Sequence, residues 1–485
     1  MNLFEKSWPD GLPIGSSWVP ASEQDVIFPY NGQSVAAAPV GTVEHALAAV
    51  DAAVSARRTM GQLPSHVRRA WLRGVHTAVE ARRDQFEHLL VLETGKPLRD
   101  CKVEVARALV TLDTGADEVA RLHGETVPLD LLPSGEGMIG FWQRKPIGVV
   151  IGITGFNYPL LLATHKVAPA IASGCPIVLK TAPSTPLSTL WLVHLIRQCA
   201  EQVGAPTEGV QLVTGDVSVG ETLTTDPRIG IVSFTGSSVV GHAIAKAAAP
   251  RKVVLELGSN SALIVDGDAD IEAVAQATVR GGYYASGQAC ISIQRILVVD
   301  SIRDAYLNRL TQLMKDVVVG DPRKLETQVS ALINGEATSR VSMWIDDAVA
   351  AGARVLHGGA SFGSCIQPTV LIDIPEGVKI WDEEVFGPVV CVRTVANLDE
   401  AIKQVNTSRF GLQASIFTSS IQNAFRAIEE LEVGGVVVNE VPGYRSDTMP
   451  YGGVKDSGTG REGPRFAIEE FTVTRMAIIR PVAGD

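Results

Sequence analysis

The fold is decided by a stretch that begins with the apolar run Gly148-Val149-Val150-Ile151-Gly152-Ile153 and then repeats its pattern. A turn containing Asn157 and a helical run follow, and then come the strand-like residues 176–180 and 210–213, with the helical residues 186–203 between them. Short apolar strands that alternate with helices are typical of a parallel sheet covered on both faces. We therefore predict an α/β fold whose first sheet is a Rossmann-like, dinucleotide-type sheet.

Outward from this stretch, the chain predicts a second α/β unit and a small β element. A chain of 485 residues with 46% apolar content is expected to form two or three domains. Residues 261–265 and 271–284 again read as strand and helix, and no linker separates them from the first unit. Residues 124–145 read as a β-hairpin, which fits either an arm for subunit contact or a surface meander.

Charge and cysteine usage limit the partners and the compartment. The net charge of -11 argues against nucleic acid and against acidic membrane surfaces, because both need a concentrated basic field. The most apolar region, residues 147–179, is interrupted by polar residues and prolines, so we predict no membrane span. The six cysteines form no C-x-x-C pair and no zinc spacing, and the N-terminus has no signal peptide, so we predict no metal site and a cytoplasmic location.

One cysteine stands in a setting that suits chemistry. Cys290 lies in the small-residue stretch Gly287-Gln288-Ala289-Cys290-Ile291-Ser292, where a loop could hold its sulfur at the wall of a cavity. The alternatives are a nucleophilic thiol and an inert buried cysteine, and the loop alone does not decide between them.

Two glycine patterns compete as a phosphate-binding turn. The G-x-G-x-x-G run at residues 458–463 lacks a preceding apolar strand, so we interpret it as a structural loop. Phe234-Thr235-Gly236-Ser237, with Gly241 four residues later, follows a strand and opens a helix, which aims free N–H groups at a phosphate.

Seven ordered motifs together resemble the aldehyde dehydrogenase superfamily over nearly the whole chain. They are Gly155-Phe156-Asn157-Tyr158-Pro159, Lys180-Thr181-Ala182-Pro183-Ser184-Thr185-Pro186, Phe234-Thr235-Gly236-Ser237, Leu255-Glu256-Leu257-Gly258, Gly287-Gln288-Ala289-Cys290, Glu383-Glu384-Val385-Phe386-Gly387-Pro388 and Pro450-Tyr451-Gly452-Gly453-Val454-Lys455. The resemblance implies a Rossmann-like cofactor domain, an α/β catalytic domain and an oligomerisation arm. The implied ranges are 1–124 and 146–257 for the cofactor domain, 125–145 for the hairpin, 258–450 for the catalytic domain, 451–473 for a return segment and 474–485 for a C-terminal oligomerisation strand.

The resemblance also implies the catalytic residues. Cys290 would attack a small aldehyde to give a thiohemiacetal, whose oxyanion is held by the Asn157 amide and the Cys290 N–H. Hydride transfer to NAD or NADP would leave a thioester, which water activated by Glu256 hydrolyses to the acid, while Lys166 helps to relay protons. Taken singly, Glu256 also fits a surface carboxylate and Asn157 a turn residue.

The resemblance also implies a set of cofactor-binding residues. Lys180 and Glu384 would bind the two ribose hydroxyl pairs, and Phe386 would pack at the nicotinamide end. The remaining implied residues are Pro183, Ser184, Phe234, Gly236, Ser237 and Leu257. Pro183 replaces a glutamate that repels a 2′-phosphate in many relatives, so the choice between NAD and NADP stays open.

For the substrate, the chain resembles the branch that handles lactaldehyde-, glyceraldehyde- and phosphonoacetaldehyde-like compounds. Arg107 and Arg445 match positions that grip an anion, while Ala289 stands where a third arginine is usual for phosphonate and Tyr158 where histidine can occur. Leu162 and Ile291 complete the predicted substrate residues. We expect a short polar or anionic aldehyde with a hydroxy, carboxy, sulfo or phosphono group.

Other functions remain open at this level. They are a CoA-acylating relative, an aromatic or aliphatic aldehyde dehydrogenase of the same fold, and a catalytically silent structural relative. The arm implies a homodimer or a homotetramer.

Overall fold

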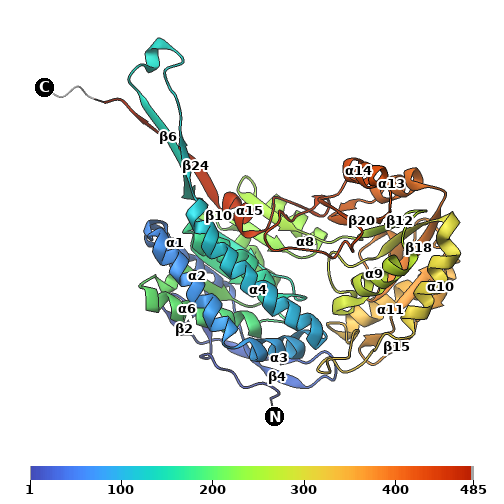
Figure 1. Ribbon diagram of the computed structural model, residues 1–485. Coiled ribbons are helices and arrows are strands. Elements are labelled where there is room, and N and C mark those ends of the chain that lie inside the picture. Colours follow the sequence, from blue (N-terminus) through green and yellow to red (C-terminus); the bar gives the residue numbers. More distant parts are fainter. Residues whose placement is uncertain (1, 482–485) are drawn as a thin grey trace.

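The computed structural model describes residues 2–481, which form two α/β lobes and a projecting β arm (Figure 1). The first lobe is built on a six-stranded sheet in which all strands but one run parallel. Its spatial order is β23 (Gly458–Thr459), β11 (Lys252–Glu256), β10 (Ile229–Thr235), β7 (Val149–Ile153), β8 (Ile177–Lys180) and β9 (Val210–Val213). The predicted strands of this stretch are confirmed, and so is the Rossmann-like α/β class.

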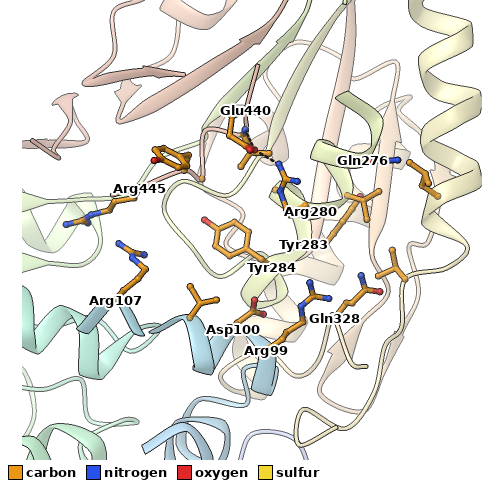
Figure 2. Close-up of a pocket in the computed structure, with 18 of the residues that line it drawn as sticks. Arg99, Asp100, Arg107, Gln276, Arg280, Tyr283, Tyr284, Gln328, Glu440 and Arg445 are labelled. Carbon is orange, nitrogen blue, oxygen red and sulfur yellow. Dashed lines mark hydrogen bonds and ion pairs between the residues drawn. The ribbon is translucent and has the colours of Figure 1, made fainter. Parts of the chain in front are cut away.

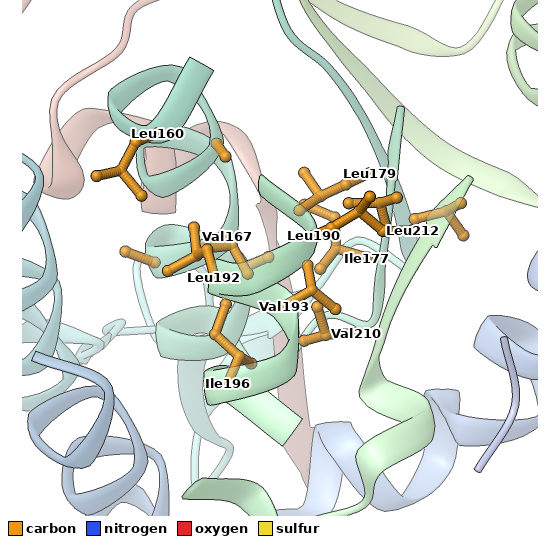
Figure 3. Close-up of a cluster of buried hydrophobic side chains, with 14 of the residues drawn as sticks. Leu160, Val167, Ile177, Leu179, Leu190, Leu192, Val193, Ile196, Val210 and Leu212 are labelled. Carbon is orange, nitrogen blue, oxygen red and sulfur yellow. The ribbon is translucent and has the colours of Figure 1, made fainter. Parts of the chain in front are cut away.

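Helices cover both faces of the first sheet because they present long apolar faces. They are α1 (Val43–Gln62), α2 (Ser65–Glu80), α3 (Arg83–Thr94), α4 (Leu98–Glu118), α5 (Pro159–Ser173), α6 (Leu187–Val203), α7 (Val217–Thr225) and α8 (Ser238–Ala248). Every residue of α5 is buried, since this helix lies under α4 and against the sheet. Figure 3 shows the resulting core, where leucine, valine and isoleucine side chains of α5 and α6 meet those of β8 and β9.

The second lobe holds a seven-stranded sheet, also parallel except for one edge strand. Its order is β14 (Arg354–His357), β17 (Thr369–Ile372), β18 (Val389–Val395), β13 (Arg295–Val299), β12 (Ala262–Val265), β20 (Gln413–Phe417) and β21 (Gly435–Val438). Its main helices are α9 (Ile271–Tyr283), α10 (Arg303–Met314), α11 (Gly335–Ala350), α13 (Leu398–Asn406) and α14 (Ile421–Glu430), and the short α12 spans Lys379–Asp382. The prediction of a second α/β unit is confirmed.

The arm contains one strand more than the predicted hairpin. β5 (Gly124–Thr126) and β6 (Ile139–Pro146) form the hairpin, and β24 (Thr472–Ile479) pairs antiparallel along the whole of β6. β24 follows α15 (Pro464–Glu470) and runs out beside β6 in Figure 1. The residue ranges assigned to domains stay a proposal, and residues 482–485 of the predicted C-terminal strand lie outside the described residues.

Two local features differ from the expectations. The N-terminal segment, for which no strand was predicted, contains β1 (Leu12–Ile14), β2 (Ser17–Val19), β3 (Ser22–Ile27) and β4 (Ser34–Val40). Within the glycine run at 458–463, interpreted as a loop, two residues form β23 against β11. Among residues 2–481, no helix is both long and apolar enough to cross a membrane.

Candidate active site

The loop that carries Cys290 is held in an unusual backbone conformation. Ala285, Ser286 and Gly287, which follow α9, have φ values of 49°, 56° and 73°, all in the left-handed region. A Cβ on Gly287 would lie 2.1 Å from the carbonyl oxygen of Gly387, so only glycine fits there. Non-glycine residues in this region cost free energy and persist only when neighbours fix them. This tight reversal carries the chain from α9 into the segment with Cys290.

Cys290 lines a cavity of about 470 Å³ between the two lobes. Most of the predicted site residues line the same cavity, namely Arg107, Asn157, Tyr158, Leu162, Gly236, Ser237, Glu256, Leu257, Ala289, Cys290, Ile291, Glu384, Phe386 and Arg445. Lys166, Lys180, Pro183, Ser184 and Phe234 do not line it. The structure therefore brings residues from both sheets to one enclosed space.

The Cys290 sulfur lies 3.1 Å from the hydroxyl oxygen of Tyr451. Burial raises the pKa of the Cys290 thiol to about 11, while the Tyr451 hydroxyl acts in the opposite direction. The other five cysteines are buried, so Cys290 is the most accessible thiol of the chain.

Asn157 lies in the turn between β7 and α5, beside the Cys290 loop. Its side-chain Nδ2 donates to the Gln288 carbonyl at 2.9 Å, which places the amide next to the nucleophile segment. Its own carbonyl accepts a hydrogen bond of 2.8 Å from the Lys96 ammonium. The Asn157 main chain is therefore fixed by Lys96, and the side-chain amide of Asn157 lies on the cavity side.

Two buried charges hold this turn in place. Lys96 forms an ion pair with Glu104, and its ammonium lies 3.7 Å from the centre of the Tyr158 ring. The other Glu104 oxygen accepts from the Leu160 and Leu161 N–H groups at 3.0 and 3.2 Å, and so satisfies the first turn of α5. Because a buried charge needs a partner, replacing either Lys96 or Glu104 by a neutral residue would leave the charge of the other unpaired.

Glu256, the last residue of β11, is buried without partners. Neither carboxylate oxygen has a hydrogen-bond partner among the described residues. Burial, and then the neighbouring charge of Glu462, raise the pKa of Glu256 well above its ordinary value, against the attraction of Arg445 and Lys166. Burial and this neighbouring charge therefore favour the protonated form of Glu256.

Beside Glu256 lies a group of charged and titratable side chains, which we call the ionic cluster: Arg107, His165, Arg445, Asp447 and Glu462. Asp447 accepts two hydrogen bonds from Arg107 at 2.8 and 2.9 Å and lies 3.0 Å from His165. Glu462 lies 3.3 Å from Arg445 and 3.4 Å from His165. Although burial opposes it, these partners hold the pKa of Asp447 well below its usual range.

Lys166 connects this cluster to the floor of the cavity. Its ammonium donates to the Thr235 and Ser233 hydroxyls at 2.9 and 3.1 Å and to Glu462 at 3.2 Å. Although Glu462 is buried, this ammonium and His165 hold its pKa well below the ordinary value. Lys166 thus contacts the cavity through Thr235 and Glu462.

Some of the residues predicted to hold a dinucleotide pack closely against neighbouring glycines. Glu384 accepts from the Ser259 N–H at 3.0 Å, and burial raises its pKa to about 7. A Cβ added at Gly258 would lie 2.4 Å from a Glu384 oxygen, and one added at Gly236 would lie 2.5 Å from the Phe234 ring. These close approaches leave no room for a side chain at Gly258 or Gly236.

Most of the other predicted cofactor residues lie at or just after the carboxyl ends of strands in the first sheet. The Ser237 hydroxyl accepts from the Val240 N–H at 3.4 Å and caps α8. Lys180 ends β8 and donates to the Gly215 carbonyl at 3.0 Å. Pro183 and Ser184 are exposed in the loop after β8, and the Phe386 ring meets the Phe156 ring edge-on at 5.6 Å between centroids.

An outer chamber of about 710 Å³ continues from the cavity towards the surface (Figure 2). The two spaces share Arg107, Tyr158, Tyr284, Gly443 and Arg445 in their walls. Figure 2 shows Arg107 and Arg445 at one end of the chamber, with Arg280 and Glu440 paired at another. The chamber offers a route from solvent to Cys290.

Several residues in the cavity wall or beside it were missed by sequence reasoning. Tyr451 lies inside a quoted motif but was given no role. Glu462 lies inside the glycine run interpreted as structural, and Asp447 lies two residues after Arg445. The signal for Glu462 was available in principle, because a lysine on the fully apolar α5 needs a buried carboxylate as partner. No sequence signal points to the pairing of Lys96 with Glu104.

Comparison with known proteins gives consistent matches along the chain. Residues 18–477 match the model of the aldehyde dehydrogenase family. A 3-sulfolactaldehyde dehydrogenase from Priestia aryabhattai is 39% identical over 471 residues, which cover 97% of this chain and 98% of that protein. Among solved structures, aldehyde dehydrogenase 21 from Physcomitrella patens, in complex with the reaction product succinate, superposes with a TM-score of 0.94 at 36% identity, covering 98% of each chain. A glyceraldehyde-3-phosphate dehydrogenase from Methanocaldococcus jannaschii, complexed with NADP, gives a TM-score of 0.91 at 34% identity, covering 95% of this chain and 100% of that one.

Proposed function

The chain belongs to the aldehyde dehydrogenase family, and we propose that it oxidises a short aldehyde bearing one negative charge to the carboxylic acid, with reduction of NAD or NADP. The observation that carries this proposal is the meeting of Cys290, Asn157 and Glu256 at one cavity from three distant segments. A thiol, an amide donor and a carboxylate are the groups that oxidation through a thioester requires.

In the first step, the Cys290 thiolate forms a bond to the aldehyde carbon. The carbonyl π electrons move to the oxygen, and the resulting oxyanion accepts hydrogen bonds from the Asn157 Nδ2 and the Cys290 N–H. Preorganised donors aimed at a developing oxyanion typically contribute about 10²- to 10³-fold each to the rate. The contacts of Asn157 with Gln288 and Lys96 support this role, because they fix the amide before the substrate arrives.

A bound nicotinamide cofactor would supply the acceptor for the hydride that leaves the thiohemiacetal carbon, and the re-formed carbonyl would be a thioester of Cys290. Glu384 and Lys180 would bind its ribose hydroxyls, and the open start of α8 at Ser237 would face its phosphates. Exposed valines on the neighbouring helices α7 and α8, Val217 and Val239, offer apolar surface for the adenine. No acid stands at Pro183 to repel a 2′-phosphate, so both NAD and NADP fit.

In the last step, Glu256 takes a proton from water as the water oxygen bonds to the thioester carbon. The carbon–sulfur bond then breaks, and the sulfur leaves as the Cys290 thiolate with the electron pair. Glu462 and Lys166, which contact each other next to Glu256, would pass the proton onwards. The raised pKa of Glu256 means that this step becomes faster as the pH rises.

The balance of charge beside the cavity supports a singly charged aldehyde. The three cations Arg107, Arg445 and Lys166 outnumber the two carboxylates that they pair with, Asp447 and Glu462, by one positive charge. A sulfonate or carboxylate matches this surplus, whereas a doubly ionised phosphonate exceeds it. The small side chain of Ala289 adds no further cation, and the similarity to a 3-sulfolactaldehyde dehydrogenase points the same way.

A substrate panel tests this proposal. We expect NAD(P)H formation with sulfo- and carboxy-substituted short aldehydes, and a kcat/KM at least about tenfold lower with phosphonoacetaldehyde, since one unmatched charge costs about 1.4 kcal/mol or more. Replacement of Cys290 by Ala should abolish oxidation of every substrate. A Cys290→Ala enzyme that still reduced NAD(P) would contradict the proposal, and acyl-CoA formation in the presence of CoA would identify the acylating alternative instead.

The arm supports a proposal about assembly. β24 is an edge strand of the arm and carries exposed apolar residues, including Ile478 and Ile479, while β21 is an edge strand of the second sheet. We propose that the arm of one copy pairs with another copy to form a homodimer or homotetramer. Sedimentation of an Ile478→Lys variant should show a smaller species than the wild type, and an unchanged assembly would contradict this role of β24.

A further inference from the structure

We propose that Tyr451 is a further catalytic residue, whose hydroxyl donates a hydrogen bond to the Cys290 sulfur and holds it as the thiolate. The inference rests on the proposed role of Cys290 as nucleophile. The distance of 3.1 Å between the Tyr451 oxygen and the sulfur is the observation that carries it. In residues 2–481, this hydroxyl is the one side-chain group recorded within hydrogen-bond distance of the Cys290 sulfur.

The ring of Tyr451 is fixed before any substrate binds. Its side chain is buried, with 3% of the residue exposed. The guanidinium of Arg445 lies 3.6 Å from the ring centre, and the Tyr451 main chain exchanges two hydrogen bonds with Glu462, of 3.1 and 2.7 Å. A donor held this firmly loses little conformational freedom when it bonds to a charged acceptor.

Between the two groups, the tyrosine is the donor and the cysteine the group that ionises. Burial, and then the neighbouring Cys290 charge, raise the pKa of Tyr451 well above its ordinary value, so the phenol keeps its proton. Among residues 2–481, no ammonium or imidazolium is a direct hydrogen-bond partner of the thiol, unlike the cation-assisted thiols of many nucleophilic cysteines. The Tyr451 hydroxyl is the direct hydrogen-bond donor available to the sulfur anion, and the charge of Arg445 also favours that anion.

This hydrogen bond would act at both ends of the reaction. Before attack, the hydroxyl stabilises the thiolate, whose electron pair then forms the bond to the carbonyl carbon. In hydrolysis, the carbon–sulfur bond breaks and the pair returns to sulfur, where the same hydroxyl stabilises the leaving group. Tyr451 keeps its proton throughout, so the proton balance of the reaction is unchanged.

The test is a comparison of Tyr451→Phe with wild type in the alkylation of Cys290 by iodoacetamide as a function of pH. Because a hydrogen bond to a charged group contributes about 1.5–3 kcal/mol, the midpoint of the alkylation profile should rise by about one to two pH units. At neutral pH the single-turnover rate of NAD(P)H formation should fall roughly ten- to hundredfold, in proportion to the thiolate fraction. Tyr306→Phe is the matched control, because its buried hydroxyl bonds Thr278 at 2.8 Å in the core of the second lobe and its loss should leave the profile unchanged.

A second variant changes the donor without removing it. Site-specific replacement of Tyr451 by 3-fluorotyrosine makes the phenol a stronger donor, so the alkylation midpoint should move down. An unchanged midpoint in both Tyr451 variants would overturn the inference. If Tyr451→Phe folds poorly, an unchanged midpoint in the fluorinated protein alone would also overturn it. Cys290→Ala, assayed in parallel, separates the two proposals: persistent aldehyde oxidation would overturn the nucleophile itself, whereas its loss with unshifted Tyr451 profiles would overturn only the role of Tyr451.

Discussion

Two regions beside the same cavity differ in the direction in which the pKa values of their buried carboxyl groups are shifted. We call the first the reactive wall, formed by Asn157, Glu256 and Cys290, and the second is the ionic cluster. Glu256 in the reactive wall is 4% exposed, and Glu462 and Asp447 in the ionic cluster are 2% and 4% exposed. The pKa of Glu256 is nevertheless raised by burial and by Glu462, while the pKa values of the two cluster carboxyls are lowered by cations despite their burial.

The difference shows that the charged neighbours of a carboxyl group, and not its degree of burial, decide its protonation state at this site. In the ionic cluster each carboxylate touches at least two cationic or imidazole groups, so the charges persist and can position an anion. In the reactive wall the groups that change charge during the reaction are left without ionic partners. The pKa values of these groups therefore respond strongly to small changes in nearby charge.

The largest effect should come from the base of the reactive wall. Glu256→Gln removes the group that activates water, so steady-state kcat should fall by about 10²- to 10⁴-fold. Formation of the thioester does not need this base, so a rapid burst of NAD(P)H, equal to about one equivalent per active site, should remain in stopped-flow experiments. Loss of the burst together with kcat would show that Glu256 acts before the thioester.

Asn157→Ala should have the next largest effect. Loss of one oxyanion donor is expected to lower kcat by about 10²- to 10³-fold and to reduce the burst rate equally. The free energy of unfolding should change little, because the lost hydrogen bond to Gln288 is worth only about 1 kcal/mol. A large loss of stability with normal kcat would assign Asn157 a structural role.

Within the ionic cluster, Asp447→Asn should change specificity and stability together. Removing one negative charge leaves two surplus positive charges near the substrate, so the kcat/KM ratio of phosphonoacetaldehyde to a monoanionic aldehyde should rise by about tenfold.

The same variant should lose about 3 kcal/mol of unfolding free energy at neutral pH, because Arg107 keeps its charge without its carboxylate. A depressed pKa contributes its full stabilisation only above the unfolded pKa, and this contribution is lost as the pH falls towards the folded pKa. The difference from wild type should therefore shrink as the pH falls below about 3.9, as measured by denaturant titration. A pH-independent difference would contradict the ion pair.

The link between the two regions can be tested through Glu462. Its negative charge raises the pKa of Glu256, so Glu462→Gln should lower that pKa. The basic form of Glu256 would then be present at lower pH, and the rising limb of the kcat profile should move down by about one unit. A shift to higher pH would contradict the role of Glu462 in raising the pKa of Glu256.

The smallest effect is expected outside both regions. Arg280 and Glu440 form an ion pair in the wall of the outer chamber, with side chains 57% and 39% exposed. Solvent screens such a pair, so Arg280→Gln should change the unfolding free energy by less than about 1 kcal/mol and leave kcat unchanged. An effect as large as that of Asp447→Asn would contradict the contrast between exposed and buried charge in this molecule.

The sequence alone determined the α/β class and most of the cavity wall. Periodic apolar strands predicted both parallel sheets, because the pattern of a strand buried on both faces is local. The motifs around Asn157, Glu256 and Cys290 could be recognised for the same reason, since each is a short run in fixed order. The N-terminal strands β1 to β4 were missed because β1 and β2 have only three residues each and none of the four shows a clear apolar alternation.

Only the tertiary structure decided which side chains meet. Tyr451 contacts Cys290 across 161 residues, and Asp447 contacts Arg107 across 340. Such pairs leave no periodic trace in a single sequence, because the chain carries no local record of its long-range partners. The sequence therefore supplied the nucleophile, the base and the oxyanion donor. Folding supplied the charges and hydroxyl around them, and these set which of those groups are ionised, since each pKa depends on what lies within a few ångströms.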